Sequence, residues 1–274
     1  MADVTLTAAL RSNLLSLQGT QRLLDQTQLR LATGLKVNSA LDNPSAFFAA
    51  QSLNNRAGDL NNLLDGMGQA IQTLKTADEG IKGITSFLEQ AQAVAQQALD
   101  ALNADTAADI TSFKTSFDAI LGQSDALAAD SSYRGTNLLS GTATQVVNFS
   151  EAATPSTLSI TGYDLVVGGD LTVTTGAWGS TTAIQTAIDA IKADLTTIRN
   201  DASVLGSNLN IIQTRQDFTQ NLINVLKEGA DKLTVADKNE EGAKLLSLQT
   251  TQQLGITSLS LASQANQSIL RLFQ

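Results

Sequence analysis

The fold is decided by residues 53–102, which read LNNRAGDLNNLLDGMGQAIQTLKTADEGIKGITSFLEQAQAVAQQALDAL. Apolar residues recur there in steps of three and four, the spacing that places side chains on one face of an α-helix. One sevenfold set is apolar throughout: Leu53, Leu60, Met67, Leu74, Ile81, Leu88, Ala95 and Leu102. The interleaved set is apolar at four of its seven positions: Ala57, Leu64, Ile71 and Leu99. A stripe this long and narrow is typical of a coiled-coil seam, so the sequence predicts a long helix that packs on a partner.

Residues 184–233 repeat the pattern over the same length. Thirteen of the 15 stripe positions there are apolar, from Ile184 through Ile191, Ile198, Leu205 and Ile212 to Leu233. At about 1.5 Å per residue, each stretch would form a rod of roughly 75 Å. Two rods of equal length with one stripe each are predicted to pack on each other. Glycines recur in both, and because each costs about 1 kcal/mol of helix propensity, we expect them to interrupt the rods and make them depend on packing.

A third helix is predicted between about residues 105 and 130, where Ile110, Phe113, Phe117, Ile120 and Leu127 lie at helical spacing. With the two rods it would make a small bundle. The fold class is therefore mostly α: long antiparallel coiled-coil-like rods, paired terminal helices and a small β insertion. The predicted segments are a terminal helix at 1–43, a rod at 44–139, an insertion at 140–182, a rod at 183–235 and a terminal helix at 236–274.

The middle of the chain changes character. Residues 140–182 contain no Lys or Arg and are rich in Thr, Ser and Gly. Short apolar runs at 158–160, 165–167 and 171–174, with Gly168 and Gly169 between the last two, predict strands around a glycine-containing hairpin turn. We expect this insertion at the tip of the helical rod.

Both ends of the chain carry apolar seams with little charge. Leu10, Leu17, Leu24 and Leu31 repeat every seven residues, and residues 245–274 contain a single charged residue, Arg271. Exposed helices normally carry many charges, so an uncharged polar face indicates burial among other helices. Short helices without partners are marginal. We therefore expect the two ends to pair with each other and with neighbouring subunits, and to become ordered on assembly.

Composition removes several kinds of chemistry. The chain has 274 residues, 17 Lys and Arg against 26 Asp and Glu for a net charge of −9, no His and no Cys. A histidine-dependent triad and the usual zinc sites are excluded, while carboxylate, Lys or Ser chemistry stays open. The acidic balance argues against nucleic acid and anionic membranes. We expect no enzyme activity, no cofactor and no metal, and we interpret Asp237, Glu240 and Glu241 as a solvated turn.

Two local signals concern chain breaks and targeting. Asp42 or Asn43 is a predicted N-cap, with Pro44 in the first turn of the following helix. The opening residues 1–7 have neither the basic nor the apolar region of a cleavable signal peptide.

Three stretches resemble bacterial flagellins. Residues 31–42, LATGLKVNSALD, are similar to the N-terminal signature of that family. Residues 133–141, YRGTNLLSG, resemble the segment that closes its N-terminal helical part, and residues 261–273, LASQANQSILRLF, resemble its terminal helix. Together these likenesses cover roughly 1–141 and 184–274.

The resemblance implies a structural filament subunit for swimming motility. In that family the two chain ends line the filament channel, the long helices form the next shell and the insertion faces outward. Subunits are exported unfolded by a type III apparatus, without a cleavable signal, and end in the extracellular filament. The implied partners are further copies in an open helical polymer, an export chaperone, a cap and hook-associated proteins. The subunit-interface candidates are Leu10, Leu14, Leu17, Leu24, Leu31, Leu248, Leu259, Ile269, Leu270 and Phe273.

One segment departs from the family pattern. Many flagellins detected by the vertebrate innate receptor carry the run Leu-Gln-Arg-Val-Arg-Glu-Leu, and the matching segment here contains Leu88, Gln90 and Gln92 without either arginine. This departure predicts weak or no receptor activation, as for flagellins of the short alphaproteobacterial type. The main alternative function is a hook–filament junction protein, which has similar termini. An enzyme carried in the insertion and a non-flagellar coiled-coil adhesin or effector are the remaining alternatives.

Overall fold

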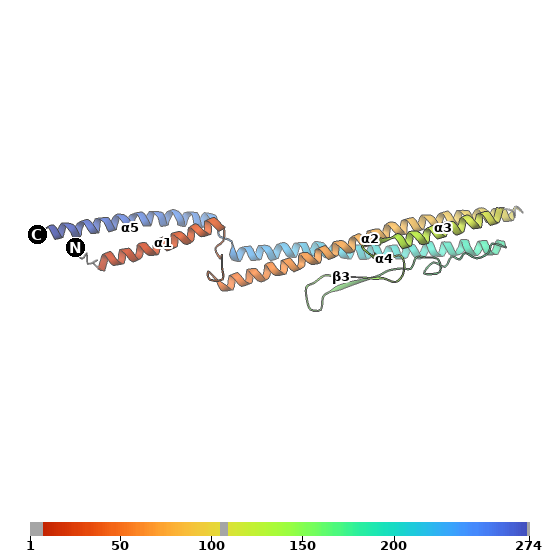
Figure 1. Ribbon diagram of the computed structural model, residues 1–274, viewed down its shortest axis with the longest axis horizontal. Helices are drawn as coiled ribbons and strands as arrows, with labels where there is room; N and C mark the ends of the chain where they lie inside the picture. Colours follow the sequence, from red (N-terminus) through yellow and green to blue (C-terminus); the bar gives the residue numbers. More distant parts are fainter. Residues whose placement is uncertain (1–7, 105–108, 273–274) are drawn as a thin grey trace. The chain divides into compact units, whose positions relative to one another are not determined.

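The computed structural model describes residues 8–104 and 109–272, and Figure 1 traces the chain from end to end. The chain divides into two compact units. The first combines Met1–Asn55 with Val225–Gln274, and the second is Arg56–Asn224.

Five α-helices account for most of the described residues. They are α1 (Ala8–Thr33), α2 (Pro44–Asn103), α3 (Ile110–Asp130), α4 (Thr181–Thr234) and α5 (Lys238–Leu272). The mostly α fold class, with long helical rods, paired terminal helices and a small β insertion, is confirmed.

The core of the second unit lies where α2, α3 and α4 pack side by side, with α2 and α4 antiparallel (Figure 1). The predicted stripes form this core: Met67 and Leu88 from α2 and Ile191 and Ile212 from α4 are fully buried. Phe117 of α3 is also fully buried, and its ring centroid lies 4.7 Å from that of Trp178. Tertiary packing of these apolar faces therefore stabilises helices whose glycines weaken them in isolation.

The glycines do not interrupt α2 as expected, because the helix runs unbroken through Gly80 and Gly83. They allow close packing instead. A Cβ built on Gly80 would lie 2.4 Å from Ser131 Oγ and 2.5 Å from Leu139 Cδ1, and one on Gly83 would lie 2.4 Å from Leu127 Cδ2. The missing side chains leave room for the end of α3 and the segment after it.

The β insertion forms a different hairpin from the predicted one. Strand β3 (Thr144–Asn148) pairs antiparallel with β4 (Thr157–Thr161), with Val146 opposite Ser159. The segments on either side of Gly168 share only an isolated bridge between Val167 and Leu171. The predicted turn at Gly168 and Gly169 exists, and the predicted strand at 158–160 lies within β4, but the strands expected at 165–167 and 171–174 do not form.

Carboxylates explain this difference, because they take the backbone N–H groups that a ladder would need. Asp194 of α4 accepts hydrogen bonds from the N–H of Thr172 and of Val173, and Asp125 of α3 accepts one from the N–H of Val167. These bonds tie the insertion along the helices rather than at the tip. Buried N–H groups need a partner, and here the helices supply it.

The β3–β4 hairpin is held at its far end by two basic side chains. Arg56 of α2 forms an ion pair with Glu151, and the guanidinium of Arg215 in α4 lies 5.2 Å from the ring centroid of Phe149. Both contacts place the hairpin against the flank of the second unit, so the expected position at the rod tip is wrong.

A second, smaller hairpin closes α3. Strand β1 (Ser132–Tyr133) pairs with β2 (Thr136–Asn137), and Arg134 between them has φ of 49°. The amide of Asn137 donates to the carbonyls of Ala128 and Ala129, which are among the last carbonyls of α3. The segment that resembles the family motif at 133–141 therefore acts as a structural cap for this helix.

Candidate assembly site at the paired terminal helices

The two chain ends pair as an antiparallel couple of helices, α1 and α5, seen side by side in Figure 1. Three contacts fix their register: Arg30 meets Glu241, Gln21 meets Gln252, and Leu17 meets Gly255. The residue numbers fall along α5 as they rise along α1. The pairing expected from the uncharged seams is confirmed.

The seam itself follows the sevenfold pattern. Its side of α1 is buried or half-buried at Leu10, Asn13, Leu17, Thr20, Leu24, Thr27 and Leu31. Its side of α5 is buried or half-buried at Glu241, Leu245, Leu248, Gln252, Gly255, Leu259 and Ala262. Steps of three and four alternate along both helices, as in a coiled coil. Two polar positions within the seam have hydrogen-bond partners: Thr20 Oγ1 donates to the Ser16 carbonyl of its own helix, and Gln252 Nε2 donates to Gln21 Oε1 of α1 at 2.6 Å.

A glycine in α5 receives a leucine from α1. A Cβ on Gly255 would lie 3.1–3.2 Å from the Cγ and Cδ2 carbons of Leu17, closer than ordinary van der Waals contact. The absence of a side chain at 255 therefore lets Leu17 seat directly on the α5 backbone. This contact helps to fix how far one helix slides along the other.

The segments that join these helices to the rods are held together by backbone hydrogen bonds. Leu35 and Val235 form an antiparallel bridge, the N–H groups of Lys36 and Val37 both donate to the Thr234 carbonyl, and the Ala236 N–H donates to the Gly34 carbonyl. Gly34 has φ of 71°, a conformation that favours glycine and ends α1. The joint within the first unit is thus a short backbone ladder rather than a free hinge.

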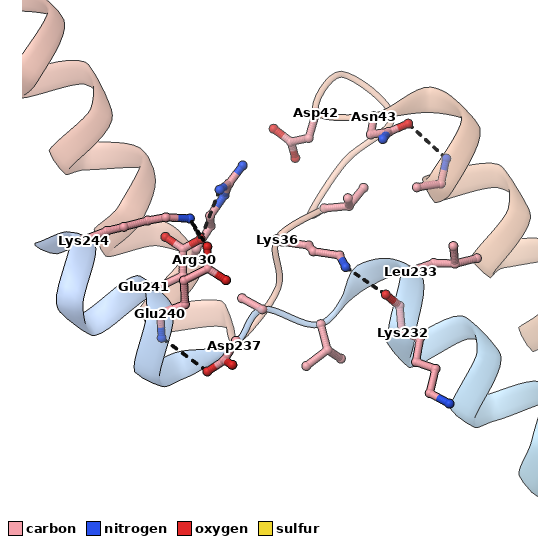
Figure 2. A pocket seen from close by; sticks show the side chains of 14 residues that line it. Arg30, Lys36, Asp42, Asn43, Lys232, Leu233, Asp237, Glu240, Glu241 and Lys244 are labelled. Atoms are coloured by element: carbon pink, nitrogen blue, oxygen red, sulfur yellow. Dashed lines mark hydrogen bonds and ion pairs between the residues drawn. The ribbon is translucent and has the colours of Figure 1, made fainter.

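Beside this ladder lies an open cleft of about 580 Å³, drawn in Figure 2. Arg30 Nη1 lies 3.2 Å from Glu241 Oε1, and Lys244 Nζ lies 2.7 Å from Glu240 Oε1. Asn43 Oδ1 accepts the Ala46 N–H at the start of α2. The predicted N-cap at this break is therefore Asn43, with Pro44 as the first helical residue.

Asp42 does not cap α2 but orders the loop that precedes it. Its Oδ2 accepts the N–H groups of Asn38 and Ser39 and the Ser39 hydroxyl, which holds the loop before α2 in shape. The hydrogen bond from the Ser39 N–H, followed by that from the Asn38 N–H, lowers the pKa of Asp42 below its ordinary value. The carboxylate that orders this loop is therefore ionised at neutral pH.

The expectation that Asp237, Glu240 and Glu241 form a solvated turn is wrong for Glu241. Asp237 caps α5 by accepting the N–H groups of Asn239 and Glu240, but Glu241 is 4% exposed. Its Oε1 meets Arg30, and at 3.6 Å also Lys244. A buried carboxylate of this kind is stabilised by its cationic partners. The pairing of α1 with α5 supplies Arg30, and the sequence pattern alone did not indicate this ion pair.

The described part of the chain contains neither a candidate metal cluster nor a candidate membrane span. No group of three or more acidic side chains there is arranged to hold a metal ion. None of the described helices combines the length and hydropathy needed to cross a membrane.

The predicted interface residues fall into three groups. Leu10, Leu17, Leu24, Leu31, Leu248 and Leu259 lie on the seam inside the chain, whereas Leu14 is exposed on α1. Phe273 and the side chains of Ile269 and Leu270 lie outside the described residues. In the segment matched to the receptor motif, Leu88 is fully buried, Gln90 is exposed and Gln92 is half-buried.

A second set of apolar residues on these helices was not singled out from the sequence. Leu15 and Leu29 of α1 lie opposite the seam and are 66% and 51% exposed. On α5, Leu246, Leu254 and Leu261 lie opposite the seam and are 64–67% exposed. The sequence did contain a signal for this second set. Several leucines lie outside the sevenfold register, and on α5 they lie in a stretch without charged residues.

These features, two terminal helices paired along a seam and joined to long rods, coincide with a known family. The family profile for the bacterial flagellin N-terminal helical region matches residues 5–144, and that for the C-terminal helical region matches residues 188–273. The chain belongs to the bacterial flagellin family. Flagellins are structural proteins that polymerise into filaments, and the family is not an enzyme family.

Relatives of this flagellin span its full length. Flagellin FljM of Caulobacter vibrioides is 32% identical over 260 residues, which is 94% of each chain, and the flagellin of Brucella melitensis is 28% identical over 100% of both chains. Both organisms are alphaproteobacteria. The crystal structure of Bacillus cereus flagellin shares 20% identity with a TM-score of 0.46, covering 55% of this chain and 86% of that one.

Proposed function

We propose that this flagellin is the repeating subunit of a bacterial flagellar filament that serves swimming motility outside the cell. The observation that carries the proposal is the exposed leucine face of α1 and α5, opposite their seam. In a monomer these leucines would be exposed to water. Neighbouring copies that pack on this face would bury it, and a head-to-tail contact that does not close gives an open helical fibre.

Under this proposal the seam and the outer face have separate roles. Leu10, Leu17, Leu24, Leu248 and Leu259 pair α1 with α5 inside each copy, which presents the outer leucines as a ready surface. The carboxyl-terminal residues Ile269, Leu270 and Phe273 extend the same pattern towards the end of the chain. Leu14, exposed on α1 beside the seam, joins the contacts between copies.

The marginal stability of α1 and α5 also bears on how the chain is exported and when its ends become ordered. We propose that the chain leaves the cell unfolded through the type III apparatus without a cleavable signal, held beforehand by an export chaperone. The terminal helices have too little apolar burial to be stable alone. They would become fully ordered as subunits add under the filament cap, above the hook-associated proteins.

The test is electron microscopy of the purified chain concentrated alone. A filament subunit should form long fibres whose number rises with protein concentration. The alternative, a hook–filament junction protein, should remain as monomers or short assemblies under the same conditions. An absence of fibres across salt and precipitant conditions that polymerise a Caulobacter flagellin would contradict the proposal.

We also propose that the chain activates the vertebrate flagellin receptor weakly or not at all. The segment around Gln90 and Gln92 offers amides where the receptor-active pattern has arginines, so charge-assisted hydrogen bonds are lost. A reporter-cell assay with purified monomer should give little signal. Potent activation by the monomer would refute this part of the proposal.

A further inference from the structure

The second unit carries a polar groove between α2 and α4. Its volume is about 820 Å³, within the usual range for sites that bind small molecules. No lysine or arginine is among the described residues that line it. The polar lining consists of two carboxylates and five amides, which are Asn61, Gln69, Gln72, Gln216 and Gln220. The groove is therefore rich in hydrogen-bonding groups but offers no positive charge.

Three of these amides are free to bind a ligand. Gln72, Gln216 and Gln220 make no hydrogen bond through their side chains within the described part of the chain. Asn61 uses only its Nδ2 group, which donates to the Ala57 carbonyl. Each free amide offers two N–H donors and a carbonyl acceptor. Donors and acceptors thus lie together on two helices that the core holds in place.

Tyr133 holds a fourth amide in one orientation. Its hydroxyl donates to Gln69 Oε1 at 3.2 Å, so the carbonyl end of this amide is engaged and the Gln69 Nε2 group keeps its N–H donors. Tyr133 itself is half-buried in the small hairpin that closes α3. The contact fixes a donor at the groove, which lowers the entropic cost of binding a ligand there.

Gly68 leaves the groove open down to the backbone of α2. A Cβ built on Gly68 would meet no atom within 4 Å beyond its neighbours in the helix. Packing requires a glycine at Gly80 and Gly83, but it does not require one here. Since glycine lets another molecule approach the backbone closely, a ligand has room to lie against α2 at this point.

We propose that this groove binds a neutral oligosaccharide, an activity beyond the filament function and independent of it. Sugar hydroxyls both donate and accept, so a row of them matches the amides and the carboxylates of Asp65 and Asp217 together. A polyamine would pair with the carboxylates but would leave the amide donors without acceptors. Nucleic acids and anionic sugars would meet two carboxylates and no cation, because Arg215, next to Gln216 in sequence, lies against Phe149 instead.

The test is isothermal titration of the purified monomer with maltotriose, cellotriose and chitotriose, and separately with spermidine. Gly68→Leu fills the groove with a side chain. Gly58→Leu is the matched control, since its Cβ is equally unobstructed and it lies on α2 outside the groove. A second variant, Gln72→Ala/Gln216→Ala, removes two free amides, and circular dichroism checks that each variant folds. Because monomer is used, the result does not depend on whether the chain polymerises.

We expect at least one trisaccharide to bind the wild-type and Gly58→Leu chains with equal affinity. Its affinity should fall at least tenfold in Gly68→Leu and in Gln72→Ala/Gln216→Ala. A trisaccharide that binds both groove variants as it binds the wild type would overturn the inference, because its site would lie elsewhere. Binding of spermidine alone, or no binding of any trisaccharide at millimolar concentration, would overturn it as well.

Discussion

At the scale of single residues, Asp194 shows how a buried carboxylate holds the insertion. It is 1% exposed and accepts three hydrogen bonds, from the Thr172 N–H at 2.8 Å, the Thr172 hydroxyl at 2.7 Å and the Val173 N–H at 2.9 Å. Asp194→Ala should lower the free energy of unfolding by about 2–4 kcal/mol, because it leaves buried donors without a partner. Denaturant unfolding followed by the fluorescence of Trp178 would measure this.

The control for that substitution is Asp189→Ala on the same helix. Asp189 is exposed and pairs with Lys192 at the surface, where such pairs contribute little. It should change stability by less than about 0.5 kcal/mol. Equal losses for the two variants would show that the bonds to Thr172 and Val173 do not anchor the insertion.

For Asp201 we predict the opposite effect on stability from that for Asp194. Burial, and then the nearby Asp170, raise the pKa of Asp201 above its ordinary value of 3.8, and its Oδ2 is buried without a hydrogen-bond partner. The folded chain thus holds this proton more tightly than the unfolded chain. Its contribution is present below about pH 3.8 and is lost as pH rises through the raised folded-state pKa.

Asp201→Asn should therefore raise Tm at pH 7, by roughly 2–4 °C, because the amide carries no charge to desolvate. The gain should shrink as the pH falls towards 4. Calorimetry at several pH values would show this, with exposed Asp217→Asn as the control. A gain that is constant with pH would mean that titration of Asp201 is not its cause.

At the scale of elements, the register of α1 on α5 depends on Leu17 seated against Gly255. Gly255→Leu should push the two helices apart and destabilise their pairing by about 1–3 kcal/mol, because the seam is overpacked. Gly242→Ala is the control, since nothing lies within 4 Å of a Cβ there, and it should stabilise α5 by about 1 kcal/mol through helix propensity. Hydrogen exchange along α1 would register both effects, and unchanged protection in Gly255→Leu would contradict the register.

The helices were predictable because their apolar periodicity is local and long. The stripes at 53–102 and 184–233 lie within α2 and α4, and the sevenfold leucines of α1 lie on its seam with α5. The insertion was not predictable in the same way. Asp125 and Asp194, distant in the sequence, accept the N–H groups of Val167, Thr172 and Val173 that strands there would need, and no local pattern reports that.

The candidate assembly site was predictable mainly on its inner side, since Leu14 is the one exposed residue among the described members of the predicted set. Sevenfold spacing finds residues that pair two helices of one chain, such as Leu24 and Leu248, but the outward Leu15, Leu29 and Leu254 lie outside the register of those seams. The ion pair between Arg30 and Glu241 joins residues 211 positions apart. Only the antiparallel register of α1 and α5 brings them together.

At the scale of the whole molecule, exposed leucines and the absence of charge coincide on α5. Leu246, Leu254 and Leu261 are exposed within residues 245–270, which contain no charged residue. The second unit holds its own core around Phe117, Trp178 and Ile191, none of which belongs to the terminal helices. The exposed leucines of α5 can therefore be removed without removing that core.

Deleting residues 245–274 should accordingly abolish filaments while the second unit still folds. The deletion removes most of α5, and with it the partner of the α1 seam and the outer leucines Leu246, Leu254 and Leu261. Trp178, the chain's one tryptophan, is 7% exposed in the core of the second unit, so its fluorescence should still report a cooperative unfolding transition. Electron microscopy would score assembly in parallel. Filaments from the shortened chain would contradict the assembly role of α5, and loss of the tryptophan transition would show that the core depends on the terminal pair.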